Sequence, residues 1–409
     1  MMSHRRGARG GRIRPGEGGT IMRGTRLRFF AAGMLALALV AAACSNDDDG
    51  GGGTTAASGE TGDCAQVDSV KLQLQWYTQA QFAGYFAAQD QGFYADQCLD
   101  VENVEGGVDI VPQQPLADGA VDFAIAWVPK ALATREAGAN IVDIAQVFQR
   151  SGTLQVSFAQ EGITTPTDFA GKTVGNWGFG NEYEIFAALT EAGLDPASDV
   201  TLVQQDFDMS GLLSGDIDAA EAMTYNEYAQ VLEAVNPDTG ELYQPSDFNT
   251  ISYEEEGVGM LQDAIWADGE RLASDEAYQD IAVRFVTASL QGWAYCRDNV
   301  EACRDLVVAE GSKLGDSHQL WQMNEINKLI WPAASGVGFI DQAAWDRTAE
   351  IAQNTANLEG TTVLTAPPDA GAYTNDIVTQ ALANLQELGV DTTGDSYQPI
   401  EVTLQEGGA

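Results

Sequence analysis

Four short apolar runs in this sequence each end in an aromatic side chain. The runs end at Trp76 and Tyr77, at Trp127, at Trp177 and at Tyr225. If they are parallel strands of α/β lobes, their carboxyl ends lie along the edge where ligands bind in such folds. A ring at that edge can stack on a flat ligand, each contact contributing about 1 kcal/mol beyond area burial. Singly each ring is also typical of a core, but together they predict a cavity for a planar molecule.

Amide and carboxylate side chains lie within a few residues of these rings. They are Gln79 and Gln81 after the first run, Asn181 and Glu182 after the third, and Asn226 and Glu227 after the fourth. Such groups can satisfy the donor and acceptor edge of a heterocycle, where an unpaired buried group would cost about 1–3 kcal/mol. Other roles stay open, because asparagine also caps helices and Glu227 fits a first-turn surface charge.

A glycine-containing loop follows the third run. It holds Asn176, Trp177, Gly178 and Gly180, and leads into the helix that Asn181 and Glu182 open. Glycine lets the backbone approach a ligand, and free N–H groups at a helix start suit a carbonyl, a phosphate or a carboxylate. The glycine spacing fits neither a dinucleotide fingerprint nor a Walker loop. A tight strand-to-helix turn is the alternative.

The candidate loops contain no basic residue, and Lys130 and Lys172 are only nearby in sequence. A sulfonate, nitrate or phosphate would therefore depend on backbone N–H groups, and an acidic cleft mouth would repel it at low salt. We accordingly rank neutral or cationic heterocycles above small anions, and a flavin or an aminopyrimidine fits best.

The elements that would carry these residues alternate between strand and helix. Strands are expected at 70–76, 99–105, 121–127, 154–159, 173–177, 201–205 and 219–224, and helices at 80–91, 110–119, 130–137, 182–192 and 226–234. A strand at 258–267 is followed by helices at 275–297, 303–310, 319–330, 342–358 and 375–388. Such alternation predicts an α/β fold with parallel sheets and right-handed crossovers. The length exceeds what one core usually holds, so two lobes with a cleft between them are expected.

The N-terminal region has the pattern of an export signal. Three arginines precede an apolar run over 29–40, which is too short to span a bilayer, and Ala41-Ala42-Ala43-Cys44 is similar to a bacterial lipobox. This predicts a lipidated Cys44 on an exported protein, anchored to the outer face of the cytoplasmic membrane. A plain signal peptide is the alternative, and Met22 is an alternative start. The acidic, Gly-rich and Thr-rich segment that follows resembles a flexible tether.

Charge and cysteine content agree with export. The formal net charge of −40 excludes nucleic acid and anionic membrane faces as partners, and solvation of an exported surface accounts for it. Four cysteines besides Cys44 form an even set in an oxidising compartment, which predicts the pairs Cys64–Cys98 and Cys296–Cys303. A metal site is the rival, but the spacing does not favour one, and we expect neither a metal nor a cofactor.

Residues 73–88 (QLQWYTQAQFAGYFAA), followed by Gly-Phe-Tyr at 92–94, resemble the opening of solute-binding proteins of the sulfonate, nitrate and thiamine-precursor type. Segments 178–182, 223–227, 289–293 and 321–325 are most similar to members associated with thiamine pyrimidine precursors and riboflavin. The resemblance implies a type II periplasmic-binding fold and a monomer that delivers its ligand to ABC permease and ATPase subunits. Phe82 and Tyr85 of its motif join the ligand-binding candidates.

These observations together predict the domain organisation. We expect a signal peptide at 1–43, lipidated Cys44 and tether at 44–68, a first lobe at 69–159 and 256–365, a second lobe at 160–255, and a C-terminal helix and tail at 366–409.

Catalysis is the competing class of function, because the resemblance extends to pyrimidine synthases that use pyridoxal phosphate and a histidine of their own chain. Past the predicted signal, the sequence has one histidine, His318, in a stretch with helix spacing, and no lysine in the cleft loops. A binding protein is therefore favoured over an enzyme. A receptor or scaffold that reuses the fold is a third class.

Overall fold

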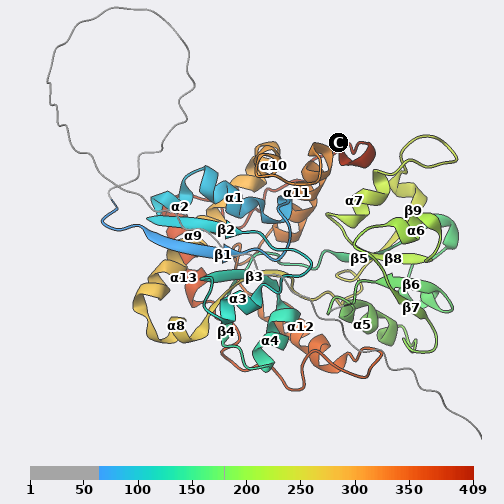
Figure 1. Ribbon diagram of the computed structural model, residues 1–409, viewed down its shortest axis with the longest axis horizontal. Coiled ribbons are helices and arrows are strands. Elements are labelled where there is room, and N and C mark those ends of the chain that lie inside the picture. The colour runs from blue at the N-terminus through green and yellow to red at the C-terminus, as the bar shows by residue number, and fades with distance from the viewer. Residues whose placement is uncertain (1–63, 179) are drawn as a thin grey trace, which may run out of the picture. The chain divides into compact units, whose positions relative to one another are not determined.

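The computed structural model describes residues 64–178 and 180–409. The expected signal peptide, the lipidation site Cys44 and the tether up to residue 63 lie outside the described residues. In the described part the chain forms two α/β lobes, each built on a five-stranded sheet (Figure 1). No helix in this part combines the length and the apolar character that crossing a membrane would require.

The first sheet has the strand order β2-β1-β3-β10-β4. Its strands are β1 (Asp68–Gln73), β2 (Leu99–Val104), β3 (Phe123–Trp127), β4 (Ile141–Gln146) and β10 (Asp263–Asp268). The first three are parallel, whereas β10 runs antiparallel to both β3 and β4. Every residue of β3 is buried because helices cover both faces of the sheet, which explains its continuous apolar sequence.

The second sheet has the order β7-β6-β8-β5-β9. Its strands are β5 (Thr153–Phe158), β6 (Thr173–Asn176), β7 (Thr201–Gln204), β8 (Ala219–Met223) and β9 (Phe248–Ser252). Here β6, β7 and β8 are parallel, and β5 runs antiparallel between β8 and β9. Two segments, 147–152 and 253–262, pass between the sheets.

Two expectations about the strands are wrong, and two strands were missed. The sheets are mixed and not parallel, because β10 and β5 each enter a sheet from the other lobe and pair antiparallel. For the same reason β5 belongs to the second sheet, whereas the sequence placed residues up to 159 in the first lobe. The strands β4 and β9 were not anticipated.

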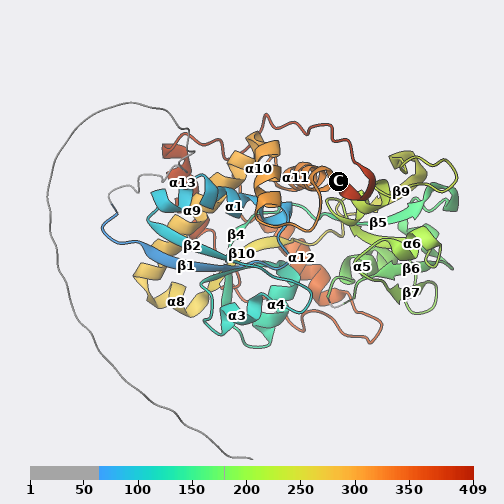
Figure 2. The same ribbon diagram turned by 45° about the horizontal axis from the view of Figure 1, so that its top comes forward.

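Helices cover the first sheet on both faces. The larger layer, seen above the sheet in Figure 2, packs on one core that includes Val70, Leu72 and Phe123. It contains α1 (Ala83–Asp90), α2 (Phe93–Asp96), α9 (Glu276–Asp298), α10 (Val300–Ala309), α11 (Asp316–Ile330) and α13 (Asp376–Glu387). The opposite face packs against α3 (Gln113–Ala117), α4 (Val128–Glu136) and α12 (Gln342–Asn354), and α8 (Gly269–Ser274) follows β10.

The close crossing of α1 and α9 requires two glycines. A Cβ atom at Gly84 would lie 2.3 Å from the Trp293 ring, and one at Gly292 would lie 2.0 Å from the Gly84 carbonyl oxygen. The Tyr85 ring packs edge-on against Trp293 in the same contact, with ring centroids 5.7 Å apart. The aromatic-Ala-Gly-Tyr motif of the sequence therefore builds a helix contact in the core.

The second lobe is smaller. Its sheet packs against α5 (Tyr183–Glu191) on one face, and against α6 (Ser210–Ser214) and α7 (Glu227–Leu232) on the other. Beyond α13 the chain returns over α11, as the red trace in Figure 2 shows, and it ends near α7, which is labelled in Figure 1. There the Gly407 N–H donates to the Glu233 carbonyl (3.2 Å) and the Ser317 N–H to the Ala409 carbonyl (3.3 Å). The C-terminal tail therefore contacts both lobes.

Both cysteine pairs are bonded as predicted. Cys64 is joined to Cys98, which connects the start of the described chain to the residue before β2. Cys296 near the end of α9 is joined to Cys303 in α10, across the turn between these helices.

Candidate ligand-binding site

A cavity of about 680 Å³ lies between the two lobes. The first lobe contributes residues that follow β1 and β3, loop 107–112 and Gln113 of α3, and the second contributes residues that follow β6, β7 and β8. The carboxyl ends of parallel strands from both sheets therefore meet at one cavity, the expected location for a ligand in open α/β sheets. Its volume lies within the range of about 300–1,000 Å³ that holds drug-sized ligands.

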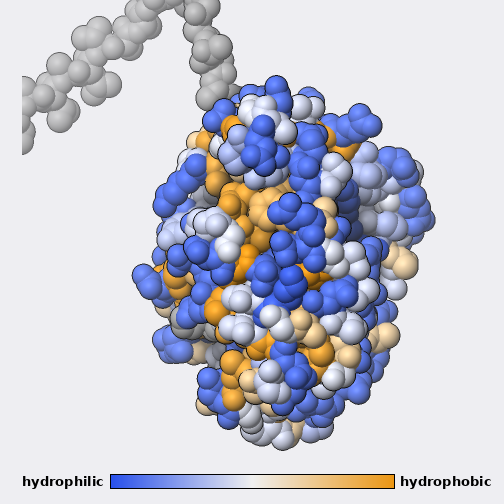
Figure 3. Space-filling view, turned by 90° about the vertical axis from the view of Figure 1, so that its right-hand side faces the viewer, coloured by the Kyte–Doolittle hydropathy of each residue, from blue (hydrophilic) through white to orange (hydrophobic). Residues whose placement is uncertain are grey.

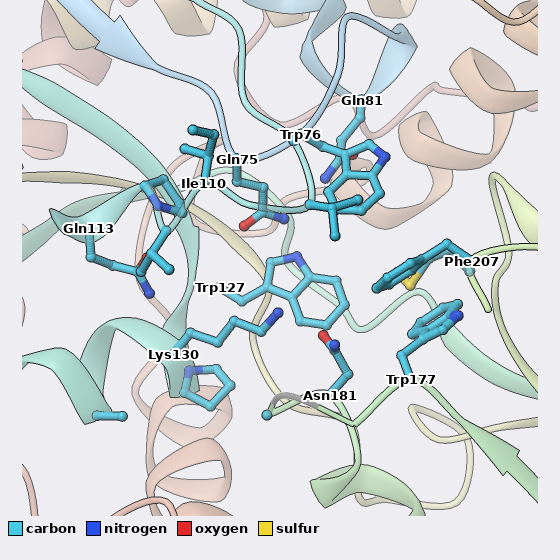
Figure 4. Close-up of a pocket in the computed structure, with 18 of the residues that line it drawn as sticks. Gln75, Trp76, Gln81, Ile110, Gln113, Trp127, Lys130, Trp177, Asn181 and Phe207 are labelled. Atoms are coloured by element: carbon cyan, nitrogen blue, oxygen red, sulfur yellow. The ribbon is translucent and has the colours of Figure 1, made fainter. Parts of the chain in front are cut away.

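Trp127, the last residue of β3, forms a platform in the middle of the cavity (Figure 4). Its indole N–H donates to Oδ1 of Asp263 over 2.8 Å. The same carboxylate accepts from Gln75 (3.1 Å) and from Gln81 (2.9 Å). Asp263 is available because β10 pairs with β3 and places it opposite Trp127. One buried carboxylate thus fixes a ring and two amides that line the cavity.

Burial raises the pKa of Asp263 to about 7, and the hydrogen bonds from Gln81 and Trp127 oppose that rise. Near neutral pH this group therefore lies close to half-protonation.

Three further rings form an aromatic cluster at one end of the cavity, namely Trp76, Trp177 and Phe207 (Figure 4). Phe207 stacks on Trp177 with centroids 6.0 Å apart and planes inclined by 19°. Its centroid also lies 5.3 Å from that of Trp76 in the first lobe. The aromatic cluster therefore connects the lobes at this end of the cavity.

Glu221 of β8 holds the third aromatic run in place. Its Oε2 accepts from the backbone N–H of Trp177 at 2.7 Å, and burial raises the pKa of this carboxyl well above its usual range. The backbone at Trp177 is therefore anchored from inside the second sheet, which orients the indole toward Phe207.

Lys130, which the sequence placed only near the candidate loops, lines the cavity, so an anion there would not depend on backbone N–H groups alone. It lies in the first turn of α4, directly after Trp127, and its Nζ is 5.0 Å from the centroid of the Trp127 ring. Burial lowers the pKa of Lys130 to about 8, while the carboxylates of Glu221, Glu182 and Asp263 oppose that shift. A positive charge is therefore available to a ligand acceptor.

Asn226 and Glu227 line the cavity and are fixed by a buried network. Glu227 accepts from the Met223 backbone (2.9 Å) and from the Asn226 amide (2.7 Å), and burial raises the pKa of this carboxyl. The Oδ1 of Asn226 lies 2.9 Å from Nε2 of His318, whose Nδ1 is 2.8 Å from Glu233. Glu227 is thus not a surface charge, and His318 of α11 connects the lobes.

The glycine-containing loop satisfies most of its own polar groups. The Gly178 N–H donates to the Asn176 side chain (2.9 Å), the Gly180 N–H to the Glu182 carboxylate (2.8 Å), and the Asn181 amide to the Gly178 carbonyl (2.8 Å). Of these residues Gly180 and Asn181 line the cavity. The backbone N–H groups of Gly178 and Gly180 are therefore already occupied within the loop.

Ten of the sixteen predicted ligand-binding residues line the cavity. They are Trp76, Gln79, Gln81, Trp127, Trp177, Gly180, Asn181, Tyr225, Asn226 and Glu227. The other six, Tyr77, Phe82, Tyr85, Asn176, Gly178 and Glu182, do not line this cavity. Phe82 and Tyr85 are buried in the core, and Tyr77 lies edge-on to Trp76 beneath the Lys313 ammonium.

Sequence reasoning missed loop 107–113, Lys130, Phe207 and the pair Thr362 and Val363, which all line the cavity. The loop carries exposed Val108, Ile110 and Val111, an apolar run outside any strand that could have indicated a ligand contact. No sequence pattern placed Phe207 or Val363 beside the strand ends.

Comparisons with known proteins agree with this geometry. The model of the family described as NMT1/THI5 like matches residues 79–302. The chain is 24% identical to a formylaminopyrimidine-binding protein of Halalkalibacterium halodurans, over 60% of this chain and 72% of that protein. It is 25% identical to the riboflavin-binding protein RibY of Chloroflexus aurantiacus, over 86% of this chain and 98% of that one.

A solved structure supports the fold. The periplasmic aliphatic sulphonate binding protein SsuA of Escherichia coli aligns with a TM-score of 0.51 at 14% identity, over 82% of this chain and 94% of that chain. The two mixed sheets flanked by helices are thus a periplasmic-binding-protein fold, as the resemblance implied.

Proposed function

The chain belongs to the NMT1/THI5-like family, and on that premise we propose that it is the extracytoplasmic solute-binding protein of an ABC importer. It captures a flat nitrogen heterocycle, riboflavin or a thiamine pyrimidine precursor, between two closing lobes. The observation that carries the proposal is the inter-lobe cavity, where Trp127 is surrounded by the side chains of Gln75, Lys130 and Asn181 (Figure 4). A ring stacked on Trp127 would have donors and acceptors within reach of its edge.

The names of the relatives support this ligand class. One is a formylaminopyrimidine-binding protein and the other a riboflavin-binding protein, and both ligands contain a nitrogen heterocycle. The predicted lipid anchor at Cys44 would hold the protein at the membrane, where it would meet the permease and ATPase subunits.

A small anion such as an alkanesulfonate is the second candidate ligand, and Lys130 is the observation that favours it. A sulfonate could pair with this ammonium, which lies in the cavity wall. The Glu182 carboxylate is among the groups that raise the pKa of Lys130, so it lies near enough to oppose an anion there. The heterocycle therefore remains the better fit.

An enzymatic role has less support. His318 does not line the cavity, and its two ring nitrogens contact Glu233 and Asn226. In this position it ties α11 to α7 and has no direct access to a bound ligand.

Isothermal titration calorimetry tests the proposal with three probes: riboflavin, formylaminopyrimidine and an alkanesulfonate. We expect one of the two heterocycles to bind with a stoichiometry of one per chain. Binding of the sulfonate alone would replace the first candidate by the second, and the absence of binding by all three would contradict the importer role as stated.

A further inference from the structure

The cavity has two chemically different ends. The aromatic cluster of Trp76, Trp177 and Phe207 lies at one end, and Gln113 and Ile110 lie at the other, with Trp127 and Lys130 between them (Figure 4). A single ring stacked on Trp127 would leave one of these ends unfilled in a space of about 680 Å³.

Gln113 at the far end is a buried polar group that needs a partner. Its side chain is 2% exposed and lines the cavity, and its Oε1 accepts no hydrogen bond within residues 64–178 and 180–409. A buried acceptor of this kind calls for a donor, because polar groups removed from water are normally hydrogen-bonded. Gln113 is the first residue of α3, and no described residue, in this helix or outside it, donates to its Oε1.

Lys130 needs the opposite kind of partner. Among the described residues its ammonium makes neither a hydrogen bond within 3.5 Å nor an ion pair within 4.0 Å, and its nearest aromatic contact is Trp127 at 5.0 Å. Thr134, one helical turn further on, also lines the cavity and donates its hydroxyl proton to the Lys130 carbonyl (3.0 Å). Its hydroxyl oxygen is therefore left as an acceptor.

We propose that this end of the cavity is a subsite for a hydroxylated chain carried by the ring, so that the ligand is a heterocycle with a polyol-like side chain and not a lone ring. The inference rests on the proposed function. A hydroxyl group both donates and accepts, so one chain can satisfy the Gln113 oxygen, the Thr134 oxygen and the Lys130 ammonium. The ring then stacks on Trp127 and reaches the aromatic cluster.

An anionic chain fits the same residues less well. A phosphate or carboxylate would satisfy Lys130, but at neutral pH it would offer little or no hydrogen to the Gln113 oxygen. The Glu182 carboxylate, one of the groups that raise the pKa of Lys130, would also oppose an anion beside that ammonium. The chemistry of the subsite therefore selects hydroxyls over anions.

The test compares riboflavin with lumiflavin, which has the same ring system with a methyl group in place of the hydroxylated chain. By isothermal titration calorimetry we expect riboflavin to bind at least tenfold more tightly. In the variants Gln113→Leu and Lys130→Met that ratio should fall toward one. Gln114→Leu is the matched control, because Gln114 is exposed, does not line the cavity and donates a hydrogen bond to Asp118. In this variant the ratio of riboflavin to lumiflavin affinity should stay as in the native protein.

Equal affinities of the two flavins for the native protein would overturn the subsite, as would a ratio that Gln113→Leu leaves unchanged. Tighter binding of riboflavin 5′-phosphate than of riboflavin would overturn the choice of hydroxyl over anion. If formylaminopyrimidine binds and neither flavin does, the subsite fails while the proposed function stands. If no heterocycle binds, both fail.

Discussion

At the residue scale, the site consists of rings held by buried carboxylates. Asp263 fixes the Trp127 indole and the Gln75 and Gln81 amides, and Glu221 fixes the Trp177 backbone. Ligand rings would thus meet side chains that are already oriented, which lowers the entropy lost on binding.

Replacing Trp177 by alanine should weaken ligand binding at least tenfold, which corresponds to about 1.4 kcal/mol, because a stacking surface is lost. Calorimetry or fluorescence titration of the bound heterocycle measures this. Trp345→Ala is the control, since Trp345 is equally buried but lies outside the cavity, so that variant should lose stability and keep its affinity. An unchanged affinity in the Trp177 variant would assign that ring to packing alone.

Asp263→Asn should alter the pH dependence of stability. The folded-state pKa of about 7 lies above the unfolded value of about 3.9, so the folded state keeps its proton longer. As the pH rises from 4 to 7, Asp263 therefore lowers the free energy of unfolding by about 1.4 kcal/mol for each pH unit. Above pH 7 this loss of stability is complete.

Chemical denaturation at pH 5, 6 and 7 should consequently give a less negative slope for Asp263→Asn than for the native protein. Asp96→Asn is the control, because Asp96 is exposed and should leave the slope unchanged. Identical slopes for all three proteins would mean that Asp263 titrates near its ordinary pKa.

At the same scale, the sequence identified the rings but not the side chains that hold or flank them in the cavity. Trp76, Trp127, Trp177 and Tyr225 were found because parallel strands gather their carboxyl ends. Asp263 was missed because it lies at the start of a returning antiparallel strand. Lys130 was undervalued because it is three residues past a strand end, where the helix α4 turns it back toward the Trp127 ring.

At the element scale, the position of the site depends on how each strand enters its sheet. The alternation of strand and helix predicted the parallel strands β1, β2, β3, β6, β7 and β8. It could not predict the exchange of β5 and β10 between lobes, because local periodicity carries no information about which distant strand a segment pairs with.

The contact between α1 and α9 gives a prediction at this scale. Gly292→Ala should lower the free energy of unfolding by about 1–3 kcal/mol or more, because its Cβ would overlap the Gly84 carbonyl in a packed core. Gly211→Ala in α6 is the matched control, since its Cβ would have ordinary contacts of 3.5 Å. There the better helix propensity of alanine should leave stability unchanged or raise it by up to about 1 kcal/mol.

Thermal or urea denaturation of both variants provides the comparison. Equal stabilities of the Gly292 and Gly211 variants would show that the helices separate without cost, and the close crossing would then not be a requirement of the first lobe.

At the scale of the whole molecule, two lobes are joined by crossing segments that bond to each other. The Gly152 N–H donates to the Gln262 side chain (2.9 Å), and Gln262 in turn donates to Thr153 (2.7 Å). The surface is strongly acidic, with a net charge of −40 for the full sequence, and hydrophilic residues cover much of the face shown in Figure 3. Such a surface favours solubility and gives no support for nucleic acid binding.

Ligand binding should draw the lobes together, because Trp76 of the first lobe and Trp177 and Phe207 of the second share one cavity. Small-angle X-ray scattering should show a smaller radius of gyration when riboflavin or the pyrimidine is bound, accompanied by a change in tryptophan fluorescence. The ligand used must first be shown by calorimetry to bind. If the scattering curves with and without this ligand are the same, lobe closure is contradicted.

The central claim is that a nitrogen heterocycle occupies the cavity between the lobes. Native mass spectrometry of the protein isolated from its own host, followed by identification of the released small molecule, tests it most directly. We expect one heterocyclic molecule per chain, lost or depleted in the Trp127→Ala variant prepared in the same way. An aliphatic sulfonate, or any ligand without a ring, would contradict it.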